Sequence, residues 1–260
     1  MGIHEHFENL KKEVGIRHCL TDRDKSRVLD FSLACHTGQD SRLIESNRAV
    51  VQERFGAGAH FVSLNQVHGD RVFVAQKAEN TGWHLSDETV DADAVVTNIE
   101  RVVLSIMSAD CVPVLLYDPI ERVVAAIHAG WRGSEKAIAK KTVDTMIERY
   151  GTDPANILAG IGPAIDVCCY EVDETVAGKF SKYRDQLHQV SEKNYMLDLK
   201  KINQCQLVEA GVVEERIEIS PVCTSCSKEK FFSYRGEGGA CRGRFMSCIM
   251  LDEKKGRDRA

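Results

Sequence analysis

Short hydrophobic runs rich in β-branched residues, separated by Gly, Asp, Asn and Pro, dominate the chain from His60 onward. The first runs read HFVSL, RVFVA, ADAVVT, VVLSIM, PVLLYD and RVVAAIHA, and NILAGIG, RIEISPV, KFFSYR and RFMSCIML follow later. Runs of this length and composition between turn-forming residues are typical of β-strands. The chain is therefore expected to fold around β-sheet.

Helical patterns are fewer. The sequence predicts an early helix from Ser41 to Phe55 and a second helix that has Ser134 as its N-cap and ends at Tyr150, before Gly151. Two more helices are expected over 173–183 and 198–210. Because strands outnumber helices and regular βαβ alternation is missing, we expect an α+β fold with a mixed β-sheet and flanking helices.

Composition places the chain among ordinary globular proteins. Its 260 residues are 43% hydrophobic and 28% charged, which is enough to bury a core without disulfides or metals. No internal repeat, low-complexity tract or linker divides the sequence. We therefore expect one domain over residues 1–260, with a motif-bearing core at about 60–251.

Charge and hydropathy disfavour several classes of protein. No stretch approaches the roughly 18 apolar residues of a membrane span, and MGIHEHFENLKKEVG lacks the apolar centre of a secretion signal. The formal net charge of -5 disfavours a nucleic-acid binder. Ten cysteines without an export signal favour a reducing compartment, so we expect a cytoplasmic protein. One basic cluster is interpreted as a solvated tail and comprises Lys254, Lys255, Arg257 and Arg259.

Three segments end a hydrophobic run in a polar turn: NQVHGD at 65–70, SADCVP at 108–113 and HAGWRGS at 128–134. Their metal-binding side chains are His68, Cys111 and His128. Two imidazoles and one thiolate suit tetrahedral zinc with one open position, as in catalytic zinc sites. Because no compact spacing joins these residues, the pattern alone leaves open isolated turn histidines and a core cysteine.

The segment HAGWRGS also leads into the helix expected to begin near Ser134. Backbone amides from Gly130 to Ser134 would then face a ligand beyond His128, and helix N-termini attract anions. Arg132 is a candidate clamp for a phosphate there. A plain capping turn with a solvated arginine is the alternative.

Other polar residues are further candidates. Asp110, in SADCVP, and Asp70, in NQVHGD, are candidate acid–base, ligand-orienting or substrate-binding groups. Arg48, on the early helix, and Arg235, in FFSYR, are candidate anion-binding residues. A solvated turn carboxylate and a structural salt bridge are the respective alternatives.

Taken together, the motifs resemble a known family. NQVHGD, DADAVVT, ADCVPVLLYDP, HAGWRG, GPAIDVCCYEV and CT followed by FFSYRGEGG are similar to successive motifs of the laccase-domain proteins, or multicopper polyphenol oxidases. The match runs from about Asn65 to Met250. The resemblance implies a metal site on His68, Cys111 and His128, and a fold similar to the cytotoxic necrotising factor catalytic domain. It also implies purine nucleoside phosphorylase activity.

From this resemblance we expect a zinc-dependent enzyme that takes adenosine, inosine, guanosine or methylthioadenosine with phosphate and forms the free base and ribose 1-phosphate. An adenosine deaminase side activity is implied as well. Its partners would be purine nucleosides and phosphate, with no nucleic acid and no membrane. The sequence does not predict an oligomeric state.

Three alternatives remain. A copper-dependent polyphenol oxidase is disfavoured, and zinc is preferred to copper, because a multicopper site needs several His-x-His pairs and the chain offers only His4 and His6. A cysteine hydrolase would use Cys111 as nucleophile and His128 as base, and would not require His68. A non-catalytic partner-binding or redox-sensing protein would leave the three strand-end motifs unexplained.

The remaining cysteines give weaker signals. Near the C-terminus lie one closely spaced pair of cysteines, Cys223 and Cys226, and one widely spaced pair, Cys241 and Cys248. This is a weak pattern for structural zinc, and thiols in the core are the preferred interpretation. Cys168 and Cys169 are adjacent, so on a strand they would face opposite ways and could not both line one site.

Overall fold

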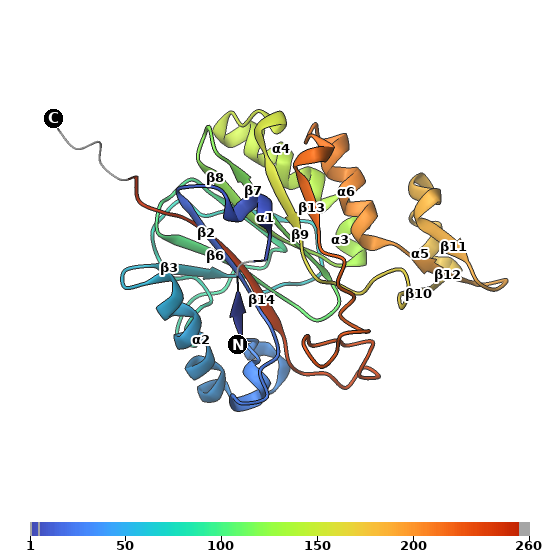
Figure 1. The fold of residues 1–260 in the computed structure, drawn as a ribbon, viewed down its shortest axis with the longest axis horizontal. Coiled ribbons are helices and arrows are strands. Elements are labelled where there is room, and N and C mark those ends of the chain that lie inside the picture. Colours follow the sequence, from blue (N-terminus) through green and yellow to red (C-terminus); the bar gives the residue numbers. More distant parts are fainter. Residues whose placement is uncertain (1, 5, 255–260) are drawn as a thin grey trace.

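The structure is a computed structural model that describes residues 2–4 and 6–254. Two mixed β-sheets pack against each other, and helices cover their outer faces (Figure 1). The predicted α+β class is confirmed, with two main sheets in place of the one that we expected. The similarity to the cytotoxic necrotising factor domain stays a prediction. Of the basic C-terminal cluster, Lys255, Arg257 and Arg259 lie outside the described residues.

The first sheet has five strands. Across the sheet they are β1 (Ile3–His4), β2 (Ile16–Thr21), β14 (Phe245–Leu251), β6 (Val102–Ser108) and β3 (His60–Ser63). β14 pairs antiparallel with both β2 and β6, so the last strand of the chain completes a sheet begun by the first. Helix α2 (Ser41–Phe55) packs on the outer face of this sheet.

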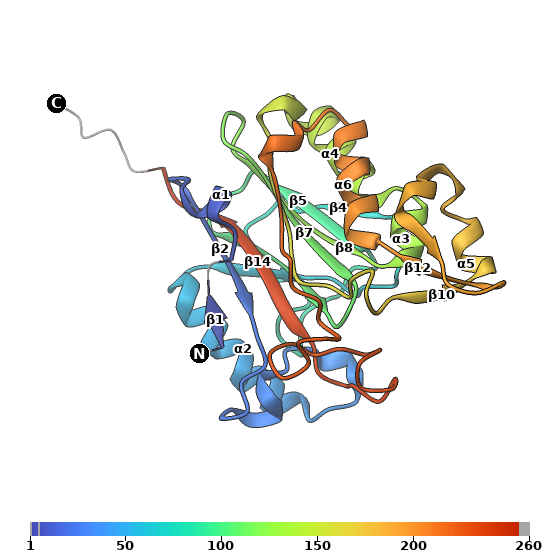
Figure 2. The same ribbon diagram turned by 45° about the vertical axis from the view of Figure 1, so that its right-hand side comes forward.

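The second sheet has six strands. Across the sheet they are β13 (Ile217–Ile219), β9 (Leu158–Ile161), β7 (Val112–Asp118), β8 (Val123–Ala129), β5 (Ala94–Thr97) and β4 (Val72–Val74). Helices α4 (Ile138–Tyr150) and α6 (Leu199–Glu209) cover its outer face. A small three-stranded sheet lies to one side with α5 (Glu174–Gly178) (Figure 2). Its strands are β10 (Glu171–Asp173), β12 (Asn194–Leu197) and β11 (Leu187–Gln189).

The central strands are hydrophobic on both faces because both faces are buried. In β7, Val114 and Leu116 contact the helical layer, whereas Leu115 and Tyr117 belong to the core between the two sheets. This alternation explains why the strand reads as one continuous apolar run. Among the described residues, no helix is both long and apolar enough to cross a membrane.

The helix predictions are confirmed in part. The predicted helix Ser41–Phe55 is present, and Asp40 caps it by accepting a hydrogen bond from the Arg42 N–H at 2.9 Å. The helix expected over 198–210 is α6, and Gly151 ends α4 as expected. The helix expected over 173–183 is shorter: α5 ends at Gly178, and 3-10 turns follow.

The single helix predicted from Ser134 to Tyr150 is wrong. Helix α3 (Trp131–Glu135) ends first, and Ala137, with φ 59° and ψ 46°, separates it from α4. Two side chains of α6 hold this break: Asn203 donates to the Ser134 hydroxyl at 2.9 Å, and Gln206 donates to the Ser134 carbonyl at 2.6 Å. These tertiary contacts override the continuous helical pattern of the segment.

The strand predicted at KFFSYR is also wrong. Residues 230–235 form turns and irregular backbone, and Phe231 and Phe232 are buried in a small cluster with Cys241 and Phe245. The aromatic residues that suggested a strand therefore serve as anchors of an irregular segment.

Candidate active site

The structure brings His68, Cys111 and His128 together. One ligand atom from each lies within 4.8 Å of the other two. His68 lies in the loop from β3 to β4, Cys111 follows β6 in the turn to β7, and His128 lies near the end of β8. Both connections cross from the five-stranded to the six-stranded sheet, so the ligands meet where the two sheets are joined.

Asp93 positions the two histidines. The Nδ1 of His128 lies 2.8 Å from Asp93 Oδ1, and the backbone N–H groups of His68 and Gly69 donate to the same carboxylate at 3.0 and 2.6 Å. Because Nδ1 of His128 is engaged, its Nε2 is left for a metal. Sequence reasoning did not single out Asp93, although the residue lies within the quoted motif DADAVVT.

Asp110 holds the turn that presents the neighbouring thiol. Its φ is 95°, a conformation that non-glycine residues rarely adopt. Thr224 and Ser233 hydroxyls both donate to Oδ1 at 2.7 Å, and the Arg235 N–H donates to Oδ2 at 2.6 Å. Both carboxylate oxygens are therefore used to fix the turn in front of Cys111.

The thiol and the buried imidazole titrate together. Burial raises the pKa of Cys111, but the charge and hydrogen bond of His128 and the hydrogen bond of His68 outweigh burial and bring it to about 6. Burial lowers the pKa of His128, but the Cys111 thiolate and the Asp93 hydrogen bond raise it to about 9. Without a metal, each group thus favours the charged form of the other, a thiolate–imidazolium pair. Metal binding would displace the Nε2 proton of His128, and the thiolate is the form that binds metals or attacks electrophiles.

This donor set fits a single metal ion. Two imidazoles and a thiolate make a borderline-soft tripod with room for a further ligand, as in catalytic zinc sites. Gly130 leaves that approach open, because a Cβ built there would lie 3.1 Å from both Cys111 Sγ and His68 Cδ2. In the part of the chain that the structure describes, no other group of potential metal ligands contains a histidine.

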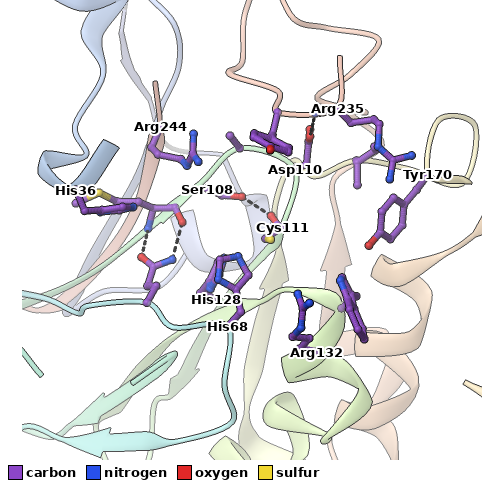
Figure 3. Close-up of a pocket in the computed structure, with 16 residues that line it drawn as sticks. His36, His68, Ser108, Asp110, Cys111, His128, Arg132, Tyr170, Arg235 and Arg244 are labelled. Carbon is purple, nitrogen blue, oxygen red and sulfur yellow. Dashed lines mark hydrogen bonds between the residues drawn. The ribbon is translucent and has the colours of Figure 1, made fainter. Parts of the chain in front are cut away.

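A cavity of about 390 Å³ lies beside the three ligands (Figure 3). Three arginines and three aromatic residues contribute to its wall: Arg132, Arg235, Arg244, Trp131, Tyr170 and Tyr234. Among the ion pairs between described residues, none involves any of these arginines. The wall also contains the carboxylate of Asp110, so three guanidinium groups face one carboxylate, and this excess of positive charge suits an anionic ligand.

The lining groups stand around the ligands. Figure 3 shows Arg132, Tyr170 and Arg235 on one side of the metal-binding group, and His36 and Arg244 on the other. The Arg235 guanidinium lies 5.4 Å from the centre of the Tyr170 ring. Burial and nearby negative charge raise the pKa of Tyr170, so its hydroxyl stays protonated and can donate a hydrogen bond.

Two predicted binding residues lie elsewhere. Arg48, a residue of α2, is buried, and its guanidinium donates to the carbonyls of Leu33 and Gly82 at 3.0 Å and also to that of Trp83. Asp70 pairs with Lys141 and Lys136 at the surface. Neither side chain lines the cavity, so the structure does not bring these residues to the site.

One amide of the predicted cradle at 130–134 is engaged within a short helix. Helix α3 begins at Trp131, directly after β8, and spans only 5 residues. The Ser134 N–H donates to the Gly130 carbonyl at 2.9 Å and does not face a ligand. The Ser134 N–H is therefore not available to a ligand, and the charged side chain of Arg132 lines the cavity.

Comparisons with known proteins show which family the chain resembles. A sequence model of the family described as multi-copper polyphenol oxidoreductase laccase matches residues 17–252. "Purine nucleoside phosphorylase YlmD" of Bacillus subtilis is 34% identical over 217 residues, which cover 81% of this chain and 78% of that protein.

Solved structures are similar over nearly the whole chain. The crystal structure of Bacillus licheniformis hypothetical protein YfiH has a TM-score of 0.86 and 32% identity, covering 91% of this chain and 93% of that chain. The crystal structure of YlmD from Geobacillus stearothermophilus has a TM-score of 0.85 and 32% identity, covering 92% of this chain and 93% of that chain.

Proposed function

The chain belongs to the multi-copper polyphenol oxidoreductase laccase family, and from this premise we propose that it is a zinc-dependent purine nucleoside phosphorylase. Its substrates are adenosine, inosine, guanosine and methylthioadenosine with inorganic phosphate, and its products are the free base and the 1-phosphate of the sugar. One observation carries the proposal: the His68, Cys111 and His128 group opens onto a cavity with three arginines that form no ion pair with a described carboxylate.

The arginines are suited to hold the attacking phosphate. In phosphorolysis a phosphate oxygen attacks C1′ of the sugar while the bond to the purine breaks. Arg132, Arg235 and Arg244 offer planar, permanently charged donors that match phosphate oxygens. Their place in this proposal is to bind the phosphate and to orient it toward the sugar.

The aromatic part of the wall is suited to the base. Trp131 and Tyr170 line the cavity and offer apolar ring surface to a purine. The leaving purine must gain a proton or a hydrogen bond on its ring. Because its raised pKa keeps the Tyr170 hydroxyl protonated, this residue is our candidate donor.

His68, Cys111 and His128 are the proposed zinc ligands, and a bound zinc ion would supply a Lewis acid beside the reacting groups. Asp93 keeps the ring of His128 in the ligating orientation. We assign Asp110 a positioning role, since both of its oxygens already accept hydrogen bonds. Arg48 and Asp70 have no place in the proposal.

Adenosine deamination is proposed as a side activity of the same cavity, with water instead of phosphate as the second reactant. The cavity volume of about 390 Å³ is within the range of small-molecule sites and would hold only one nucleoside at a time. Adenosine should therefore compete with inosine in both reactions. A cytoplasmic location is part of the proposal, and it rests on the content of ten cysteines, which suits a reducing compartment.

One observation favours a second candidate function. The Cys111–His128 thiolate–imidazolium pair is also the arrangement of a cysteine hydrolase. Such a dyad needs Cys111 and His128 but not His68. The two functions therefore differ in what they require of His68.

The test is release of hypoxanthine from inosine by zinc-loaded protein, with and without phosphate. We expect phosphate-dependent release that His68→Ala abolishes and that His84→Ala, which changes an exposed histidine in a loop, leaves intact. Full activity of His68→Ala would favour the dyad. No base release, together with oxidation of phenols at a rate set by added copper, would overturn the proposal in favour of an oxidase.

A further inference from the structure

Four cysteines outside the active site converge on one point. The Sγ atoms of Cys168, Cys169, Cys223 and Cys226 all lie within 4.8 Å of one another. Individual separations are 3.7 Å for Cys168–Cys169, 3.7 Å for Cys168–Cys226 and 3.4 Å for Cys169–Cys226. Two segments far apart in sequence thus contribute two thiols each.

This grouping differs from both sequence expectations. Cys168 and Cys169 lie in a turn after β9 and not on a strand, so their side chains can point to the same place. Cys241 and Cys248 do not join Cys223. Cys241 lies in the small cluster of buried phenylalanines, and Cys248, on β14, lies in the core between the five-stranded sheet and α2.

Backbone contacts hold the two segments in register. Ala164 and Cys223 form a parallel bridge, and the Thr224 N–H donates to the Ala164 carbonyl at 3.0 Å. The Asp166 N–H lies 3.4 Å from Cys223 Sγ and points its donor at the sulfur. N–H donors of this kind stabilise a thiolate.

A buried lysine ties the same two segments together. Lys200 is 3% exposed, and its Nζ lies 2.5 Å from Asp166 Oδ2 and donates to the Ser220 carbonyl at 2.9 Å. Asp166 precedes one pair of thiols and Ser220 precedes the other. Four thiolates around one divalent ion leave excess negative charge, and the Lys200 ammonium, on α6, is a buried positive charge that contacts both segments.

The distances match a zinc–tetrathiolate. Zinc–sulfur bonds of 2.3 Å in a tetrahedron place neighbouring sulfurs about 3.8 Å apart, close to the separations of 3.4 and 3.7 Å in the cluster. Four soft thiolates without a histidine or carboxylate are typical of a closed, structural zinc site.

We propose that Cys168, Cys169, Cys223 and Cys226 bind a second, structural zinc ion that fixes one wall of the active-site cavity. Two neighbours of the cluster connect it to that cavity, one directly and one through Asp110. Tyr170, the residue after Cys169, lines it, and the Thr224 hydroxyl donates to Asp110 at 2.7 Å. The metal therefore acts by positioning this wall and takes no part in the chemistry.

Metal analysis of the purified full-length protein tests the proposal, with independent sets of variants for the two sites. Wild type should hold two zinc ions per chain, and Cys168→Ser/Cys226→Ser should hold one. Cys205→Ser, a half-buried cysteine of α6 outside both groups, is the matched control and should hold two. The double variant should show a raised KM for nucleoside, because the cavity wall is no longer fixed. It should keep activity, because the active-site zinc is retained.

The active-site variant His68→Ala/His128→Ala gives a test that does not require the cysteine variant to fold. It should retain one zinc, and its cobalt-substituted form should show the intense sulfur-to-metal charge-transfer absorption of a tetrathiolate. Two results would overturn the proposal: no metal in this folded variant, or disulfides among the four cysteines in mass-mapped wild type. Failure of the proposed phosphorylase would leave both metal counts unchanged, so the two ideas are tested separately.

Discussion

Position 130 has no room for a side chain beside Cys111: a Cβ on Gly130 would lie 3.1 Å from the Sγ atom. The same Cβ would lie 3.1 Å from Cδ2 of His68. The backbone of Gly130 has φ -70° and ψ 167°, which any residue can adopt. The glycine is therefore needed for the space that it leaves, and two of the three proposed zinc ligands depend on that space.

Gly130→Ala should weaken zinc binding by about 10-fold or more, because the methyl group displaces ligand atoms from their positions. The fold should persist, since no backbone strain is added. Chelator competition measures the affinity, and Gly178→Ala, where an added Cβ meets nothing within 4 Å, is the control. An unchanged zinc affinity of Gly130→Ala would show that the ligand cluster does not hold the metal.

Asp93→Asn should lower the zinc affinity of the active site by about 10- to 100-fold. The amide can no longer accept every hydrogen bond that the carboxylate accepts from His128, His68 and Gly69. Asp91→Asn is a matched control, because Asp91 lies on the same segment but is exposed, and its side chain accepts a hydrogen bond from Asn65 at 2.7 Å, away from the ligands. Equal effects of both changes would mean that Asp93 does not orient the ligands.

Arg132→Gln should raise KM for phosphate by about 10- to 100-fold, as expected for loss of a charge-assisted hydrogen bond of about 1.5–3 kcal/mol. KM for the nucleoside and the zinc content should change much less. Steady-state rates over a range of phosphate concentrations measure the effect. Arg149→Gln, an exposed change on α4, is the control. If phosphate KM stays at the wild-type value, phosphate does not bind at Arg132.

His18 should make the protein less stable in mild acid. Burial, together with His6 and Lys11, lowers the pKa of His18 to about 4, and its Nε2 accepts a hydrogen bond from the Phe7 N–H at 3.2 Å. His18 therefore becomes protonated near pH 6.5 in the unfolded chain but only near pH 4 in the folded chain. Stability is full above pH 6.5 and falls by up to about 3 kcal/mol as the pH drops toward 4.

His18→Gln keeps an acceptor for the Phe7 N–H but does not titrate. In denaturant unfolding with chelator present, the loss of stability between pH 7 and 4.5 should be smaller for this variant than for wild type. Other titrating groups cancel in the comparison. Identical pH dependence of the two proteins would contradict a lowered pKa at His18.

Much of the fold could be predicted because local pattern and tertiary burial agree. The run PVLLYD is apolar on both faces and lies in β7 between two cores, and α2 begins just after its Asp40 cap. The pattern failed where distant residues decide the backbone. Ala137 breaks a helical segment because α6 binds Ser134, and KFFSYR supplies buried anchors without pairing as a strand.

The candidate site shows the same division. The three proposed ligands stood out because a polar residue at the end of an apolar strand is conspicuous in sequence. Arg48 could not be placed correctly, since its partners are carbonyl groups that no sequence pattern marks. The cysteine cluster was missed because two turns, and not one spacing pattern, bring Cys169 and Cys226 together.

The most direct test of the central claim is the fate of isotopically labelled inorganic phosphate in a reaction of zinc-loaded protein with inosine. We predict that label appears in ribose 1-phosphate in equal amount to the hypoxanthine released, and that both products are lost together in Cys111→Ser. Hypoxanthine released with free ribose and no labelled sugar phosphate would contradict phosphorolysis and would make the protein a hydrolase.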